Sequence, residues 1–302
     1  MSNVPGYPDR SSGLDALPGF KNPPLAQVRE LHTKGISGFQ VNYSHLDTKG
    51  WPTDSGEPKL FTDAWWKVYG RISEECGKLN MGIGMSTYTI DWPNGAKNLF
   101  WQRFYSKPEL NAVELVVGEK VRGKEGFKFR VSSFGCFSVR AYKVIDGVLQ
   151  KGGVDLTGRA TEWTAPAGEW EVWTFKAVRK EGSLNPMRPG SGATVIEGFY
   201  QEFENHNPGG GSKGLNFFFN DELEIGLGKF AWCDDFAHEF KKRKGYDLLD
   251  VLPAMWEDMG DITPKVRIDY ADVRMSLMEE RYFEPIYNWH TSRGIIYGCD
   301  NH

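Results

Sequence analysis

Helical and extended patterns of apolar residues alternate in the first third of the chain. Residues 25–34 form a short amphipathic segment that ends at Gly35, and the apolar run ISGFQVNY follows at 36–43. Residues 63–79 repeat this order, with apolar side chains three or four positions apart, and lead into the run MGIGMSTYTI at 81–90. Each half of this region therefore predicts a helix followed by a strand.

The period changes from helical to alternating between residues 112 and 178. The runs AVELVV, GFKFRV, FSVRAYKV and EWEVWTFKAV place apolar residues at every second position and are separated by turns that contain glycine. This pattern predicts an inserted antiparallel module that resembles a β-sandwich.

Alternation of helices and strands resumes after this module. Helices are predicted at 194–205, 234–244 and 269–293, the last with a kink at Pro285, and strands at 215–221 and 295–299. The strand LNFFFND at 215–221 is a continuous apolar run, which is typical of a strand buried on both faces.

Four strands that alternate with helices predict a parallel sheet with right-handed crossovers. The fold class expected is α/β, a partial (β/α)8 barrel of the TIM type with the antiparallel module inserted. The domain boundaries expected are an irregular arm at 1–24, the first part of the barrel at 25–110, the module at 111–180, and the continuation of the barrel at 181–302.

Composition excludes several classes of protein. The net charge of −4 comes without a concentrated basic patch, which argues against nucleic acid as a partner. No apolar run approaches the roughly 18 residues of a membrane span, which argues against a membrane as partner. The first residues lack the apolar stretch of a secretory signal, so the chain as given is expected to be cytoplasmic, and the compartment of the parent protein stays open. The cysteines Cys76, Cys136, Cys233 and Cys299 are far apart and are expected to be free thiols.

Polar residues cluster where the predicted parallel strands end, which is the edge at which such sheets bind ligands. The sharpest cluster follows the strand of three phenylalanines and comprises Asn220, Asp221, Glu222 and Glu224. Like charges and burial raise the pKa of a carboxyl group, and an acid that is protonated near neutral pH can cleave a glycosidic bond. The alternative is an acidic start to the next loop or helix, favoured by the helix dipole.

The other strand ends offer groups that bind sugars. Asp91 and Trp92 pair a carboxylate with a ring that can stack on a sugar face, or they form an ordinary turn in which the ring fills space. Asp300 is a candidate for a facing carboxylate or a strand cap. Tyr43 and His45 are candidates for stacking on the substrate and hydrogen bonding to it, or are ordinary loop residues.

No pair of histidines has the spacing of a metal site, and the motifs of phosphate-binding loops and serine hydrolases do not occur. No metal ligand, cofactor or protein partner is therefore assigned from the residues.

Several motifs together resemble the family 106 glycoside hydrolases and their uncharacterised relatives. These motifs are GISGFQVNYSH at 35–45, the stretch from TDAWW to MGIGMSTYTIDWP at 62–93, FFFNDELE at 217–224 and FKKRKGYDLLDVLPAM at 240–255. Relatives begin with a further strand and extend past the position of His302, so the chain resembles an incomplete N-terminal part of them.

The resemblance implies a barrel enzyme that hydrolyses terminal sugars of plant or microbial glycans, α-L-rhamnosides among them, with inversion and with calcium assistance in characterised members. By motif position, Glu222 is the carboxylate that acts as general acid or base, with Asp221 beside it. Enzyme activity is expected if the remaining strands of the barrel are present. The alternatives are a degenerate carbohydrate-binding protein, an inactive part of a larger glycosidase, and a protein that completes its barrel only in an oligomer.

Overall fold

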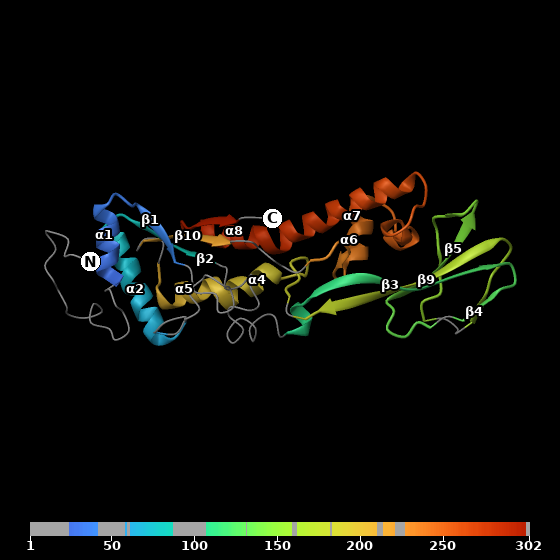
Figure 1. Ribbon diagram of the computed structural model, residues 1–302, viewed down its shortest axis with the longest axis horizontal. Coiled ribbons are helices and arrows are strands. Elements are labelled where there is room, and N and C mark those ends of the chain that lie inside the picture. The colour runs from blue at the N-terminus through green and yellow to red at the C-terminus, as the bar shows by residue number, and fades with distance from the viewer. Residues whose placement is uncertain are drawn as a thin grey trace. The chain divides into compact units, whose positions relative to one another are not determined.

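The computed structural model (Figure 1) describes residues 24–41, 58, 61–86, 107–130, 132–158, 162–181, 183–209, 214–220 and 227–299. The chain divides into two compact units. Unit 1 comprises residues 1–105, 192–224 and 284–302, and unit 2 comprises 106–191 and 225–283. This division groups residues by their contacts, whereas the domain boundaries expected above follow the order of the chain, and those boundaries stay a prediction.

Unit 1 contains a parallel sheet of four strands in the order β1, β2, β10, β12. The strands are β1 (Gly38–Val41), β2 (Gly82–Ser86), β10 (Leu215–Asn220) and β12 (Ile296–Cys299). All three pairings between neighbours are parallel, which confirms the four strands and the mixed α/β class expected from the sequence.

Helices follow or precede these strands in unit 1. They are α1 (Pro24–Thr33), α2 (Asp63–Lys78), α4 (Ser191–Val195), the π-helix η4 (Ile196–Tyr200), α5 (Gln201–His206) and α8 (Glu284–Thr291). The hydroxyl of Thr62 caps α2 by accepting a hydrogen bond from the backbone N–H of Trp65 at 3.3 Å. After α2, Asn80 adopts a left-handed φ of 53° that turns the chain toward β2.

Unit 2 is built on an antiparallel sheet in the order β11, β3, β9, β5, β6, with β7 paired to β5. Its strands are β3 (Ala112–Lys124), β5 (Ser138–Ile145), β6 (Val148–Leu149), β7 (Val154–Asp155), β9 (Glu169–Lys180) and β11 (Ala231–Trp232), and β4 (Lys128–Arg130) pairs with β8 (Glu162–Thr164) as a second sheet. The antiparallel pairing predicted between residues 112 and 178 is therefore confirmed.

Alternation along β5 and β9 sends side chains to two cores in unit 2. Tyr142 and Trp173 join a core formed with helices, whereas Ala141 and Val172 join a smaller core with Phe129 of β4. The helical elements are η3 (Pro108–Leu110), α6 (Phe236–Lys244), η6 (Leu248–Asp250), η7 (Leu252–Met255), α7 (Ile262–Met278) and the π-helix η8 (Glu279–Phe283). None of the described helices is long and apolar enough to cross a bilayer.

The long helix expected at 269–293 differs from the structure. Helix α7 begins earlier, at Ile262, and a π-helical turn separates it from α8 just before Pro285. Proline supplies no N–H to the carbonyl four residues earlier, which belongs to Arg281. That carbonyl instead accepts a hydrogen bond from the hydroxyl of Ser191 at 3.0 Å.

Candidate functional site

The carboxyl ends of the four parallel strands meet at one edge of the sheet in unit 1. In the strand register, Val41 of β1 lies opposite Met85 of β2, Phe219 of β10 lies opposite Ser86, and Asn220 lies opposite Cys299 of β12. The ends are therefore aligned to within about one residue. This alignment forms the kind of edge at which parallel sheets bind ligands.

The residues predicted for this edge mostly lie outside the described residues. Asn220 is the last residue of β10, and its backbone is placed. The remaining candidates lie outside the described residues. They are Tyr43, His45, Asp91, Trp92, Asp221, Glu222, Glu224 and Asp300. In chain order each follows one of the four aligned strand ends, so their roles in catalysis and substrate binding stay predictions.

The three phenylalanines of β10 do not share one environment. Phe218 is fully buried, whereas Phe217 and Phe219 are partly exposed on the opposite face, which corrects the expectation of a strand buried on both faces. Phe217 lies opposite Gly84, where an added Cβ would come within 1.9 Å of the Phe217 ring. Phe219 lies opposite Gly298 and leaves 3.4 Å for such a Cβ.

This arrangement places two aromatic rings over two glycines at the carboxyl half of the sheet. A partly exposed ring offers an apolar surface, on which the C–H face of a sugar can stack. The sequence pattern predicts Tyr43 and Trp92 as stacking candidates and does not indicate Phe219. The sequence signal for these rings is a glycine in each strand beside β10. Gly84 in the run GIG of β2 and Gly298 in the run YGC of β12 leave room for a neighbouring ring.

A neutral histidine supports the other face of the sheet. His290 of α8 is fully buried, and its Nδ1 donates to the carbonyl of Ile286 at 2.7 Å. Its ring lies 4.5 Å from the ring of Tyr200 and 5.1 Å from that of Phe218. Burial lowers the pKa of His290 to about 4, so the ring stays uncharged at neutral pH. It serves as a packing group beneath β10.

Among the described residues, no three histidine, cysteine or carboxylate side chains gather in a way that fits a metal ion. His206 instead stacks on Trp66, with the ring centroids 4.5 Å apart, and its Nε2 lies 3.5 Å from a carboxylate oxygen of Glu202. The calcium implied by the family resemblance stays a prediction, since the acidic residues after β10 lie outside the described part of the chain.

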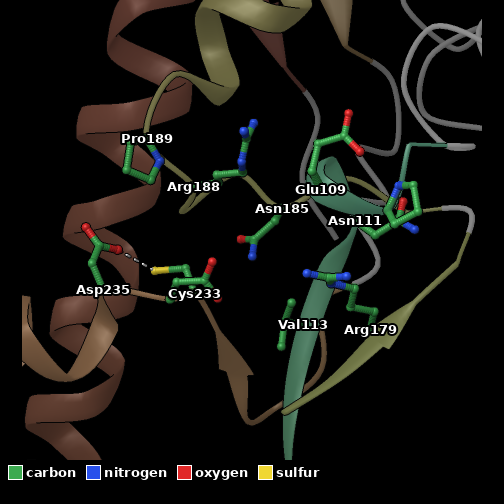
Figure 2. Close-up of a pocket in the computed structure, with 11 residues that line it drawn as sticks. Glu109, Asn111, Val113, Arg179, Asn185, Arg188, Pro189, Cys233 and Asp235 are labelled. Carbon is green, nitrogen blue, oxygen red and sulfur yellow. Dashed lines mark hydrogen bonds between the residues drawn. The ribbon is translucent and has the colours of Figure 1, made fainter. Parts of the chain in front are cut away.

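Unit 2 holds a separate cavity of about 300 Å³ (Figure 2). Its walls come from η3, the start of β3, the end of β9, the segment 185–189 and the turn between β11 and α6. The charged and amide side chains that line it are those of Glu109, Asn111, Arg179, Asn185, Arg188, Asp234 and Asp235. Sequence reasoning missed this cavity because its walls are far apart in the chain, with no shared motif.

An ion pair closes one wall of the cavity. Both Arg281 Nη atoms donate to the carboxylate of Asp235, at 2.9 and 2.8 Å, and the thiol of Cys233 donates to the same group at 3.2 Å. Figure 2 shows this thiol directed at Asp235. Hydrogen bonds from Arg281 and Cys233 outweigh partial burial and lower the pKa of Asp235, while burial and the carboxylate raise the pKa of Cys233. The thiol is therefore protonated, with the role of a hydrogen-bond donor.

Comparison with known proteins supports the fold. No protein-family model matches the chain, and no curated protein matches it. Among solved structures, the rhamnosidase from Novosphingobium sp. PP1Y is similar, with a TM-score of 0.64 and 11% sequence identity over 92% of this chain. The chain spans 44% of the length of that rhamnosidase. At this identity the likeness concerns the fold alone, and the chain has a mixed α/β fold similar to that of part of that rhamnosidase.

Proposed function

We propose that this chain is a glycoside hydrolase, or the part of one that carries the acidic strand end. The observation that carries this proposal is the aligned carboxyl edge of the parallel sheet, from which the chain leads directly into Asp221 and Glu222. The similarity in fold to a rhamnosidase supports the same class of activity.

The chemistry follows from the order of residues at this edge. Asn220 and Cys299 lie opposite each other in neighbouring strands, and the next residues in the chain are Asp221 and Asp300. Neighbouring strands are about 4.8 Å apart. In this proposal the two catalytic carboxyl groups are those of Asp300 and of Glu222, which is one residue beyond Asp221, at the separation of roughly 6.5 to 9.5 Å that an inverting glycosidase needs for its water.

In this proposal Glu222 is the general acid or base, and Asp300 is the facing carboxylate. Asp221 and Glu224 keep the local field negative, which raises the pKa of a neighbouring carboxyl group and favours the protonated acid. Phe219 supplies an apolar surface beside these groups. Tyr43, His45, Asp91 and Trp92 bind the sugar from the ends of β1 and β2.

A screen of aryl glycosides tests the proposal. The intact chain is incubated with nitrophenyl glycosides of common sugars, α-L-rhamnoside included, and release of the phenol is followed. We expect hydrolysis of at least one glycoside, and the proposed rhamnoside is the first candidate. Absence of turnover on every glycoside, with sugar binding detected by tryptophan fluorescence, would instead support a carbohydrate-binding protein.

The second candidate function, carbohydrate binding without catalysis, rests on a specific observation. Phe217 and Phe219 are both partly exposed on one face of the described sheet. A binding surface formed by Phe217 and Phe219 needs only the described sheet, whereas hydrolysis needs two carboxyl groups in place.

A further inference from the structure

The cavity of unit 2 is preformed by hydrogen bonds between its walls. The backbone N–H of Asn185 donates to the carbonyl of Leu110 in η3, and its Nδ2 donates to the carbonyl of Trp232 in β11, both at 2.8 Å. Arg281 Nη1 donates to the carbonyl of Met187 at 2.7 Å while the same side chain holds Asp235. These bonds fix the positions of three walls before any ligand arrives.

Two walls contribute guanidinium groups that have no ion-pair partner among the described residues. Arg179 on β9 and Arg188 in the segment before α4 both line the cavity. Neither has an ion pair with any carboxylate of the described residues, whereas the neighbouring Lys180 pairs with Glu114 at 2.7 Å. Figure 2 shows the side chain of Arg179 extending from β9 in the direction of Asn185. A guanidinium group offers paired N–H donors that match a carboxylate.

Two carboxylates on other walls set a further requirement for the ligand. Glu109 in η3 and Asp234 beside α6 line the same cavity, and neither is paired with a cation in the described ranges. Asp235 is already neutralised by Arg281. A ligand with several negative charges would be repelled by Glu109 and Asp234, whereas hydroxyl groups can donate hydrogen bonds to them.

The cavity volume also limits the ligand. About 300 Å³ lies at the small end of ligand-binding cavities, which span roughly 300 to 1,000 Å³. We propose that this cavity binds a small sugar acid, which is a single polyhydroxylated ring or chain with one carboxylate. The carboxylate is bound by Arg179 and Arg188, and the hydroxyl groups by Glu109 and Asp234. This site belongs to unit 2 and does not depend on hydrolysis at the sheet edge of unit 1.

Calorimetric titration of the intact chain with four probes tests this site. Glucuronate combines both features of the ligand, glucose carries the hydroxyl groups alone, acetate carries the carboxylate alone, and inorganic phosphate carries more charge. We expect glucuronate to bind about tenfold or more tightly than each of the other three, because only glucuronate satisfies both sets of side chains.

Variants assign the binding to the cavity. The double substitution Arg179→Met and Arg188→Met should weaken the binding of glucuronate about tenfold or more. The control Arg71→Met changes an exposed arginine of α2 in unit 1 and should leave this affinity unchanged. Unaltered circular dichroism and melting temperature show that the double variant is folded. Absence of glucuronate binding, equal binding of acetate, glucose or phosphate, or full binding by the folded double variant would each overturn the proposal.

Discussion

The ring of Phe217 on β10 occupies the space directly above Gly84 on β2. A Cβ at residue 84 would lie 1.9 Å from Cζ of that ring, closer than any two carbon atoms without a covalent bond can approach. The glycine is therefore a requirement of side-chain packing between two neighbouring strands.

Replacing Gly84 with alanine should consequently destabilise unit 1. We expect Gly84→Ala to lower the free energy of unfolding by about 1 to 3 kcal/mol, since the ring must move within a packed sheet. Urea denaturation followed by tryptophan fluorescence measures the change.

Gly70 provides a matched control for this substitution. It lies within helix α2, where an added Cβ meets no atom within 4 Å. Gly70→Ala should stabilise the protein by about 0.5 to 1 kcal/mol, because alanine loses less conformational freedom in a helix. Equal stability of the Gly84→Ala and Gly70→Ala variants would contradict the packing described for Phe217.

Periodicity predicts the elements of this chain better than it predicts their partners. The four parallel strands and the antiparallel strands between residues 112 and 178 follow from local patterns of apolar residues. The pattern of apolar residues predicts a later start for α7 than Ile262, although Pro264 in its first turn is a signal of a helix N-terminus.

Contacts between distant segments explain what the pattern does not reveal. The hydroxyl of Tyr142 on β5 donates to the carbonyl of Leu249 at 2.6 Å, and the hydroxyl of Tyr270 on α7 donates to the carbonyl of Ala231. Such contacts join the antiparallel sheet to later helices. Nothing in the local sequence around Arg179 or Asn185 indicates that these two residues line one cavity.

Acid should destabilise the folded protein through His290. Its pKa is about 4 in the folded state and 6.5 in an unfolded chain, so the unfolded state binds the proton first as the pH falls. Stability is therefore complete above about pH 6.5 and is lost between pH 6.5 and 4. Lowering the pH from 7 to 5 should reduce the free energy of unfolding by on the order of 2 kcal/mol through this group.

Denaturation at both pH values separates His290 from other groups. Between pH 7 and pH 5, the free energy of unfolding of His290→Leu should fall by about 2 kcal/mol less than that of the native protein. This difference does not depend on how stable the variant is at pH 7. His238→Leu, which changes an exposed histidine of α6, is the matched control. An identical pH dependence for His290→Leu and the native protein would exclude a buried neutral ring.

The three described cysteines should differ in reactivity toward iodoacetamide. Cys76 is fully buried, and burial together with Glu75 raises its pKa to about 11. Burial raises the pKa of the Cys233 thiol, and its hydrogen bond to the carboxylate of Asp235 raises this pKa as well. The partly exposed Cys136 is the most accessible of the three thiols, so it should be alkylated first at pH 8.

Peptide mass mapping after short labelling times measures this order, and all three sites should react once urea unfolds the chain. Labelling of Cys233 as fast as Cys136 in the native protein would show that the bond between the thiol and Asp235 is absent or short-lived.

The proposed hydrolase is tested most directly by the kcat values of two glutamate variants, measured with an aryl glycoside that the native protein hydrolyses. Glu222→Gln removes the proposed acid or base, and Glu181→Gln removes an exposed carboxylate that follows β9 in unit 2. Loss of general acid or base catalysis lowers a rate by about 10² to 10⁴. We predict a fall in kcat of this size for Glu222→Gln and an unchanged kcat for Glu181→Gln. Equal kcat values for the native protein and Glu222→Gln would contradict the assignment of catalysis to the acidic end of β10.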